Sequence, residues 1–445
     1  MAEPSCHGSG GAGSSGTVIP APSNMRKAVP GSRRGCFFFD LFPYSMPPAT
    51  VATATAAERL TSLDAFRGCV IVIMIWVNYL AGMPGIAWWL EHAAPRADGI
   101  TLPDLVFPGF LFMVGMAIPL ALQRHCSHVT PALLGRLLWR SASLMLAGVV
   151  LANAYRYDAQ AAPLPHAIYF LLFYVAMMLL WRQGAGKLEL AAGGILMLFL
   201  LATFRGELNS EFSSTWLQPS WWGILGMIGW SYLLCSLLYL ACRGSGTALM
   251  GVFSLLLVLY MGGTAGSLDF LPAGINAFVN VPQVLGSTAA NVLAGTLVGQ
   301  LFLRGAALSH GQRIRFMAWF ALGLFAAGML LRPYHHINKI AATESYTLVC
   351  SALVLALFLV FYVVIDVWRW RAWAVVLLPA GTNALFAYIV PDLWQQLAAV
   401  LHLPRFWWPY WETGGAAGLW NAAAVTALML LFTALATRYG LKLKF

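Results

Sequence analysis

The chain has 445 residues, of which 60% are hydrophobic and only 9% are charged. This composition excludes an ordinary water-soluble domain, because too few polar side chains remain to cover a surface that faces water. The formal net charge of +10 does not indicate nucleic-acid binding, because the cations are spread along one predicted membrane face, where they would meet anionic lipid headgroups.

The chain divides by composition into a tail and a membrane domain. Residues 1–58 are rich in Gly, Ser, Ala, Pro and Thr and lack periodic apolar faces, so we expect them to be disordered. Residues 59–445 form one predicted membrane domain, because apolar runs recur almost to the end without a long polar interval. Seven cysteines without a Cys-x-x-Cys pair indicate neither a disulfide nor a metal site.

The predicted fold is an all-α membrane helix bundle of about twelve transmembrane helices, since a spanning helix needs roughly 20 mostly apolar residues. The runs that meet this requirement lie, in chain order, at 67–86, 104–123, 136–153, 165–181, 188–204, 222–242, 247–262, 284–303, 314–332, 345–365, 372–391 and 416–437. The seventh run is short, which leaves a bundle of about eleven helices open.

The distribution of Lys and Arg predicts the orientation, because cytoplasmic loops retain positive charge. With the N-terminus inside, most of the 26 basic residues fall on the cytoplasmic side. Most acidic residues then fall in the outer loops. We therefore expect a multi-pass protein of a bacterial inner membrane, with the lipid bilayer as its solvent and both termini in the cytoplasm.

Few polar groups lie at membrane depth, and those that do gather around the first two spans. Asp64 and Arg67 are one helical turn apart and can pair at the start of the first span. Asn78 follows near the end of that span, His92 lies in the next loop, and Asp104 opens the second span. Each of these residues has an ordinary structural explanation, as a helix anchor, an interhelical hydrogen bond, an incidental loop residue or a helix cap. Polar groups in a membrane are costly, however, so their gathering points to a functional site.

The sequence around these residues resembles the heparan-alpha-glucosaminide N-acetyltransferase family in two ordered blocks. The first block contains R-L-x-S-L-D-x-F-R-G from Arg59, V-N-Y at 77–79, H-A at 92–93, and T-x-x-D-L-V-F-P-x-F-x-F from Thr101. The second contains the stretch 338–346, then Asp366, then A-G-T-N-A-L from Ala380, and Tyr388. The nearest likeness within the family is its bacterial branch described as NagX, associated with the use of N-acetylglucosamine. Residues from about 150 to 280 are not matched.

The resemblance implies an enzyme that moves an acetyl group from cytoplasmic acetyl-CoA to a terminal glucosamine, or a similar sugar acceptor, on the far side of the membrane. It also implies that a loop histidine is central to catalysis, which by position is His92. The family's common loop has a Trp-x-Gly shortly after the His-Ala pair. This chain instead reads P-R-A-D-G at 95–99 and has two extra residues before Asp104.

The residue types suit this chemistry, because attack on a thioester needs a base for the proton of the acceptor and donors for the developing oxyanion. His92 can be that base, or it can form a covalent acetyl-histidine; the sequence does not choose between these routes. Asn78 would be the oxyanion or thioester donor, and Asp104 would orient the imidazole. His166, His335, His336 and His402 are alternatives to His92 on the outer side.

Donor binding requires cations for the phosphates of CoA, to which Arg is well suited. The candidates at the cytoplasmic ends of the spans are Arg67 with its neighbour Asp64, and Arg136, Arg140 and Arg313, with Arg124, Arg315, Arg369 and Arg371 as further possibilities. The positive-inside rule explains all of these arginines without a ligand. Asn338, Lys339 and Asn383 belong to the second block and are predicted to line the pocket or to lock the bundle.

Two other functions stay open at this stage. A sugar transporter fits twelve spans with both termini inside, although the lack of deep ionisable residues and of repeated halves speaks against it. A non-catalytic scaffold fits the small-residue spacing of Gly295 and Gly299, which is typical of helix packing in membranes. A homodimer is compatible with such folds, but no interface can be read from the sequence.

Overall fold

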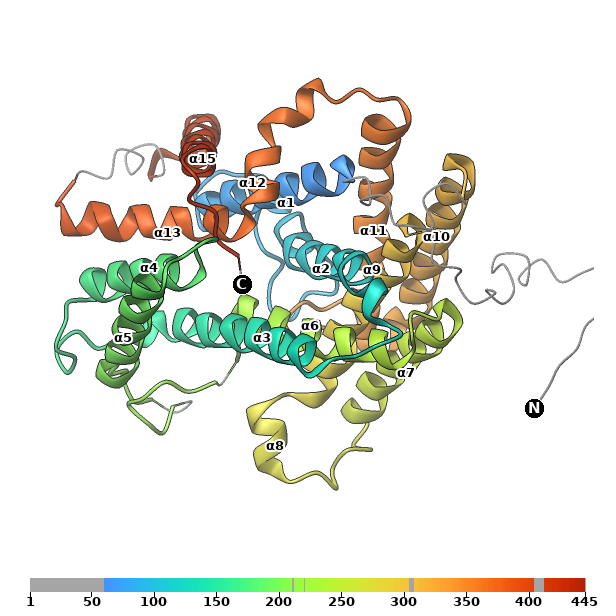
Figure 1. Cartoon of the computed structure of the whole chain (residues 1–445), viewed down its shortest axis with the longest axis horizontal. Coiled ribbons are helices and arrows are strands. Elements are labelled where there is room, and N and C mark those ends of the chain that lie inside the picture. The colour runs from blue at the N-terminus through green and yellow to red at the C-terminus, as the bar shows by residue number, and fades with distance from the viewer. Residues whose placement is uncertain (1–59, 210–211, 220, 304–307, 404–411, 445) are drawn as a thin grey trace, which may run out of the picture. The chain divides into compact units, whose positions relative to one another are not determined.

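The computed structural model describes residues 60–209, 212–219, 221–303, 308–403 and 412–444. The regular secondary structure of these residues is helical, apart from two isolated β-bridges, Tyr157 to Gly206 and Arg182 to Leu443. The expected disordered tail, 1–58, lies outside the described residues. The part of the chain that is described therefore confirms the all-α class (Figure 1).

The helices follow one another along the chain, and a long connection separates α1 from α2. Their bounds are α1 Thr61–Leu80, α2 Val106–Leu122, α3 Pro131–Ala152, α4 His166–Trp181, α5 Lys187–Thr203, α6 Gly223–Ala241, α7 Gly246–Thr264, α8 Ala273–Phe278, α9 Ala289–Gly299, α10 His310–His335, α11 Glu344–Tyr362, α12 Leu378–Thr382, α13 Ala384–Val400 and α15 Gly415–Arg438. Two π-helical segments, Val281–Thr288 and Val363–Val367, precede α9 and follow α11.

Nine helical segments within the described ranges are long and apolar enough to cross a membrane, and α4 is a shorter apolar helix. These helices confirm a polytopic membrane bundle, whereas the count of twelve spans stays a prediction. The first span begins earlier than predicted, at Thr61, so that Asp64 and Arg67 lie inside α1. It also ends earlier, at Leu80, because Gly82 and Gly85 adopt positive φ angles of 76° and 71°, which an L side chain would oppose.

The predicted continuous span 372–391 is wrong, because the structure breaks it into a 3₁₀ segment, the short helix α12 and then α13. Asn383 sits at the break with φ −126° and ψ 50°. Its buried side chain donates to Thr437 Oγ1 at 3.1 Å and to the carbonyl oxygen of Leu441 at 2.9 Å, and accepts from the backbone N–H of Leu443 at 3.0 Å. Asn383 therefore locks the C-terminal segment onto the bundle.

Glycines permit the close crossing of α2 and α9. A Cβ atom on Gly115 would clash with the carbonyl oxygen of Val292, and one on Gly295 would clash with that of Phe112. Gly299 meets the backbone of Met116 in the same way. The small-residue spacing in α9 thus packs two helices of one chain together, and every residue of α9 is buried.

Helix α1 lies in contact with α2, α11, α12, α13 and α15 (Figure 1). An added Cβ on Gly68 would clash with the carbonyl oxygen of Leu377, and one on Gly381 would clash with that of Asp64, so α1 and the α12 region approach closely. The connection between α1 and α2, which contains His92, therefore begins at a helix that is closely packed against its neighbours.

Candidate active site

Three side chains from the two sequence blocks meet at the end of the α1–α2 connection. His92 Nδ1 lies 2.8 Å from Asp104 Oδ1, and Lys339 Nζ lies 3.0 Å from the same oxygen and 2.9 Å from His92 Nδ1. Asp104 is buried, whereas 47% of the His92 side chain is exposed. The structure thus brings together two residues predicted for catalysis and one predicted for the pocket.

The Asp104 carboxylate is held by several hydrogen bonds. Its Oδ2 accepts from the backbone N–H of Ala93 at 3.1 Å, and from the backbone N–H and the hydroxyl of Thr101 at 3.2 and 2.9 Å. The hydroxyl of the buried Tyr346 donates to the main-chain oxygen of Asp104 at 2.7 Å. An ionised carboxylate is a pure acceptor and suits these donors. Asp104 is therefore held in one orientation by several hydrogen bonds, and it contacts His92 and Lys339 in addition to standing at the start of the second span.

The contacts of His92 Nδ1 do not by themselves fix its tautomer, because Asp104 Oδ1 could accept from this nitrogen and Lys339 Nζ could donate to it. The ammonium of Lys339 has no acceptor, and the ionised Asp104 has no donor. We assign the Nδ1–H tautomer, because His92 and Lys339 can then both donate to Asp104 Oδ1. The lone pair of the imidazole is thereby placed on Nε2, which is the atom able to take a proton or attack a carbonyl.

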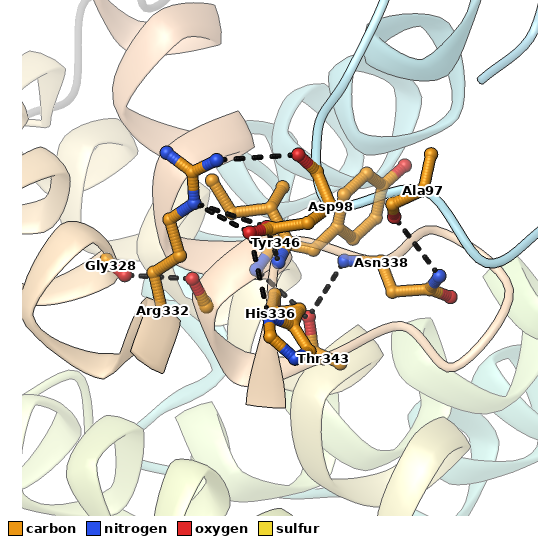
Figure 2. Close-up of polar contacts among 10 residues, drawn as sticks. Ala97, Asp98, Gly328, Arg332, His336, Asn338, Thr343 and Tyr346 are labelled. Carbon is orange, nitrogen blue, oxygen red and sulfur yellow. Dashed lines mark hydrogen bonds and ion pairs between the residues drawn. The ribbon is translucent and has the colours of Figure 1, made fainter. Parts of the chain in front are cut away.

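A second cluster fastens the loop of His92 to the last turn of α10 and to the segment that follows it. Asp98 accepts from Arg332 Nε at 3.0 and 3.1 Å and from the backbone N–H of Ile337 at 2.8 Å, and His336 Nδ1 lies 3.4 Å from Oδ2 (Figure 2). The Asn338 amide donates to the carbonyl oxygen of Pro95 at 2.7 Å. We call this group the Asp98 clasp.

The clasp explains how the two blocks reach each other. Figure 2 shows the contact of Asn338 with Ala97. Asn338 and Lys339 are neighbours in sequence, so the contacts of Asn338 with Pro95 and Ala97 hold Lys339 beside His92. The loop that departs from the family pattern at 95–99 supplies the clasp contacts. Asn338 accordingly locks loops together instead of lining a pocket.

The clasp is expected to weaken in acid. The backbone N–H of Ile337 and then the Arg332 guanidinium hold the pKa of Asp98 below its ordinary value. A carboxylate with a lowered pKa adds stability above the pKa of the unfolded chain, about 3.9, and that stability is lost as pH falls through the lower folded value. Thermal unfolding from pH 7 to pH 3 should show a smaller acid-induced fall in melting temperature for Asp98→Asn than for wild type. Equal falls would contradict this role.

Asn78 is not joined to the three central side chains by any hydrogen bond within the described ranges. It lies in the last turn of α1, and its side chain is exposed. The neighbouring Tyr79 packs against a buried cluster that includes Leu90, and Leu102 packs against the same cluster; these two leucines lie two residues before His92 and Asp104. The interhelical hydrogen bond that would have been its ordinary explanation does not occur with a described residue.

A cavity of about 760 Å³ runs between α1, α2, α3, α6, α13 and the C-terminal segment. Apolar side chains of α2 and α6 form much of its wall, and four cations line it, namely Arg67, Arg140, Lys442 and Lys444. Its volume is typical of small-molecule sites. Phe110 lines it six residues after Asp104, a separation of about 9 Å along a helix. We call this space the donor cavity.

The predicted donor-binding residues do not all lie at one site in the structure. Arg67 and Arg140 line the donor cavity, and Arg67 bonds Asp64 at 3.3 Å and the carbonyl oxygen of Gly381 at 3.2 Å. Arg136 lines an adjoining groove. Arg313 lines neither of these spaces, and its Nη1 lies 3.3 Å from the Tyr362 hydroxyl. Lys442 and Lys444 were missed as ligand candidates, and their only signal was positive charge in the last residues.

Three of the alternative histidines have contacts of their own. His335 Nδ1 lies 2.6 Å from Glu344 Oε1, His336 belongs to the clasp, and the His166 ring packs on Phe170 and Tyr157. His402 is exposed. Within the described ranges, no group of three or more His, Cys, Asp and Glu side chains is arranged to hold a metal ion.

Comparison with known proteins supports the two-block resemblance. Residues 59–263 match a family model described as a domain of unknown function, DUF5009. A human heparan-alpha-glucosaminide N-acetyltransferase is 27% identical over 390 residues, which cover 78% of this chain and 55% of the human protein. The mouse protein of the same name is 41% identical over 103 residues, covering 22% of this chain and 15% of the mouse protein. The chain thus spans about half the length of the human relative. The resemblance predicted from the motifs is confirmed: over most of its length this chain is similar to a heparan-alpha-glucosaminide N-acetyltransferase.

Proposed function

We propose that this protein is a membrane acetyltransferase, which takes an acetyl group from acetyl-CoA on the cytoplasmic side and transfers it to an amino sugar, such as glucosamine, on the opposite side. The observation that supports this most strongly is the meeting of His92, Asp104 and Lys339 at one end of the bundle. The human and mouse relatives carry N-acetyltransferase in their names. The expected setting is a bacterial inner membrane, with both termini in the cytoplasm.

His92 performs the proton transfer in this proposal. In direct transfer, the acceptor nitrogen attacks the thioester carbonyl, His92 Nε2 takes the proton of the nitrogen, and the C–S bond breaks to release CoA. In the two-step route, Nε2 itself attacks the carbonyl and CoA leaves. The acceptor nitrogen then attacks the acetyl carbon, the bond from that carbon to Nε2 breaks, and the released Nε2 takes the proton of the nitrogen. Both routes need the Nδ1–H tautomer, because it leaves the Nε2 lone pair free.

Asp104 and Lys339 position the imidazole. The positive charge that appears on His92 during either route is stabilised by the carboxylate 2.8 Å away. Lys339 contacts the same oxygen, so it helps to hold the carboxylate that orients the ring. Asn78, with an exposed amide at the end of α1, is the proposed hydrogen-bond donor to the carbonyl oxygen of the acetyl group.

The donor cavity is the proposed site for acetyl-CoA. Its cations, Arg140, Lys442 and Lys444, suit the phosphates of CoA. Its apolar wall along α2 suits the pantetheine arm and leads toward Asp104. CoA would thus enter from the end with the positive charges, and the thioester would approach His92 from within the bundle. Arg67 borders the cavity but also binds Asp64 and Gly381, so its replacement would disturb the packing of α1.

The two terminal lysines give the clearest test of donor binding. Replacing both by glutamine should raise the KM for acetyl-CoA about tenfold and leave kcat nearly unchanged, because solvent-exposed ion pairs contribute up to about 1 kcal/mol each. Initial rates over a range of acetyl-CoA concentrations would measure this effect. Arg438→Gln is the matched control, since Arg438 is exposed at the end of α15 and does not line the cavity. An unchanged KM in the double variant would remove Lys442 and Lys444 from the donor site.

A further inference from the structure

A second cavity lies beside the donor cavity, at the point where α2 ends and α3 begins. It has a volume of about 750 Å³. Its lining comes from the end of α2, the 3₁₀ turn Gln123–His125 and the first half of α3, with Tyr232 from α6. One side of α3 packs against α6. The groove therefore opens between the end of α2 and the side of α3 that does not face α6. We call this space the α2–α3 groove.

Three arginines and a histidine border the groove, namely Arg124, His125, Arg136 and Arg140. Arg124 and Arg136 are exposed, and Arg140 places its guanidinium carbon 4.7 Å from the centre of the Tyr232 ring. Among the described side chains, no carboxylate lies within ion-pair distance of these three arginines. The groove therefore gathers positive charge that the described part of the protein does not neutralise.

The remainder of the lining is apolar. Leu122, Leu133 and Leu137 form its floor, and Trp139 stands at its side with 62% of its surface exposed. The groove also lies at the ends of two candidate membrane spans, Pro103–His125 and Pro131–Arg156. Ends of spans lie at the depth of the lipid headgroups, where Trp is enriched and where basic pockets between helices bind anionic lipids.

We propose that the α2–α3 groove binds an anionic phospholipid. Arg124 and Arg136 would hold the phosphodiester, and the acyl chains would lie along Leu133, Leu137 and the exposed Trp139. A lipid fits better than a soluble phosphate compound because most of the lining is apolar. The site does not depend on the acetyltransferase activity. It shares Arg140 and Tyr232 with the donor cavity, so a bound lipid would touch the wall of that cavity.

The test uses the purified full chain in a neutral detergent, titrated with dioctanoyl phosphatidylglycerol or dioctanoyl phosphatidylcholine. Wild type should bind dioctanoyl phosphatidylglycerol more tightly than dioctanoyl phosphatidylcholine. Arg124→Gln with Arg136→Gln should weaken that binding about 30-fold, because each arginine near an anionic headgroup contributes a factor of about five. Arg124→Lys with Arg136→Lys, which keeps the charge, should bind nearly as wild type does. Arg315→Gln is the matched control, because Arg315 is also an exposed basic residue but lines neither cavity.

Two results would overturn this proposal. Equal affinities of wild type and the double glutamine variant for phosphatidylglycerol would place the lipid elsewhere. Displacement of the lipid by millimolar CoA or inorganic phosphate would assign the groove to a soluble phosphate compound. Unfolding temperatures of the variants, measured in parallel, show that a loss of binding does not come from misfolding. Acetyl transfer is not the readout, so failure of this proposal leaves the proposed activity untouched.

Discussion

Replacement of His92 by alanine is expected to lower acetyl transfer by about 10³-fold, because proton transfer by a positioned side chain contributes about 10²- to 10⁴-fold. The loss should fall on kcat, with the KM for acetyl-CoA nearly unchanged, because the donor cavity does not include His92. Initial rates with labelled acetyl-CoA and an amino-sugar acceptor would measure it. His402→Ala is the control, since His402 is exposed and is predicted to lie on the same side of the membrane. Equal activity of wild type and His92→Ala would contradict the proposed site.

The same variant separates the two chemical routes. Wild type incubated with labelled acetyl-CoA and no acceptor should retain covalent label if acetyl-histidine forms, and His92→Ala should not. Absence of label in an active wild type would favour direct transfer. Either result leaves His92 at the centre of the reaction, and the difference lies only in whether Nε2 attacks carbon or accepts a proton.

Replacement of Asp104 by asparagine is expected to lower kcat by about 10²-fold or more, although the two side chains have nearly the same shape. An amide offers one acceptor atom and an NH₂ group, so it cannot accept from His92, Lys339, Ala93 and Thr101 together. Its NH₂ group facing His92 would favour the tautomer with the proton on Nε2, which can neither attack nor take a proton. Lys339 would lose its counter-charge as well.

The rate should be followed across pH, because a change of tautomer alters the pH profile of kcat, whereas simple loosening of the loop lowers the amount of active protein at every pH. Asp158→Asn is a matched control, since Asp158 accepts backbone hydrogen bonds from Gln160 and Ala161 within its own loop, away from the site. A wild-type rate and profile for Asp104→Asn would show that the imidazole is oriented by something else.

Helix positions could be predicted because hydropathy in a membrane protein reports a local requirement, namely that each span satisfies its own backbone hydrogen bonds and faces lipid. The break at Asn383 could not, because it depends on Thr437, Leu441 and Leu443, which are more than 50 residues away. The early end of α1 had a local signal in Gly82 and Gly85, which was outweighed by the apolar residues that continue to position 86.

The residues of the candidate site likewise divide into those that the sequence could predict and those that depend on distant contacts. The resemblance singled out His92 and Asp104, whereas Lys339 was predicted only for the pocket or the bundle. Its contact with His92 joins residues 247 positions apart, and no spacing rule reaches that far. The clasp around Asp98 was equally hidden, because its partners lie more than 200 residues away, in the last turn of α10 and just after it. Among the arginines, charge alone could not separate Arg67 and Arg140, which line the donor cavity, from Arg313, which does not.

The central claim is tested most directly by acetyl transfer across a membrane that contains only this protein. Proteoliposomes would receive labelled acetyl-CoA on the side of the positively charged loops and glucosamine on the other side. We expect labelled N-acetylglucosamine on the acceptor side, in an amount that depends on acetyl-CoA and on an intact His92. Glucosamine that crosses unmodified, without dependence on acetyl-CoA and without an effect of His92→Ala, would contradict the acetyltransferase and indicate a sugar transporter instead.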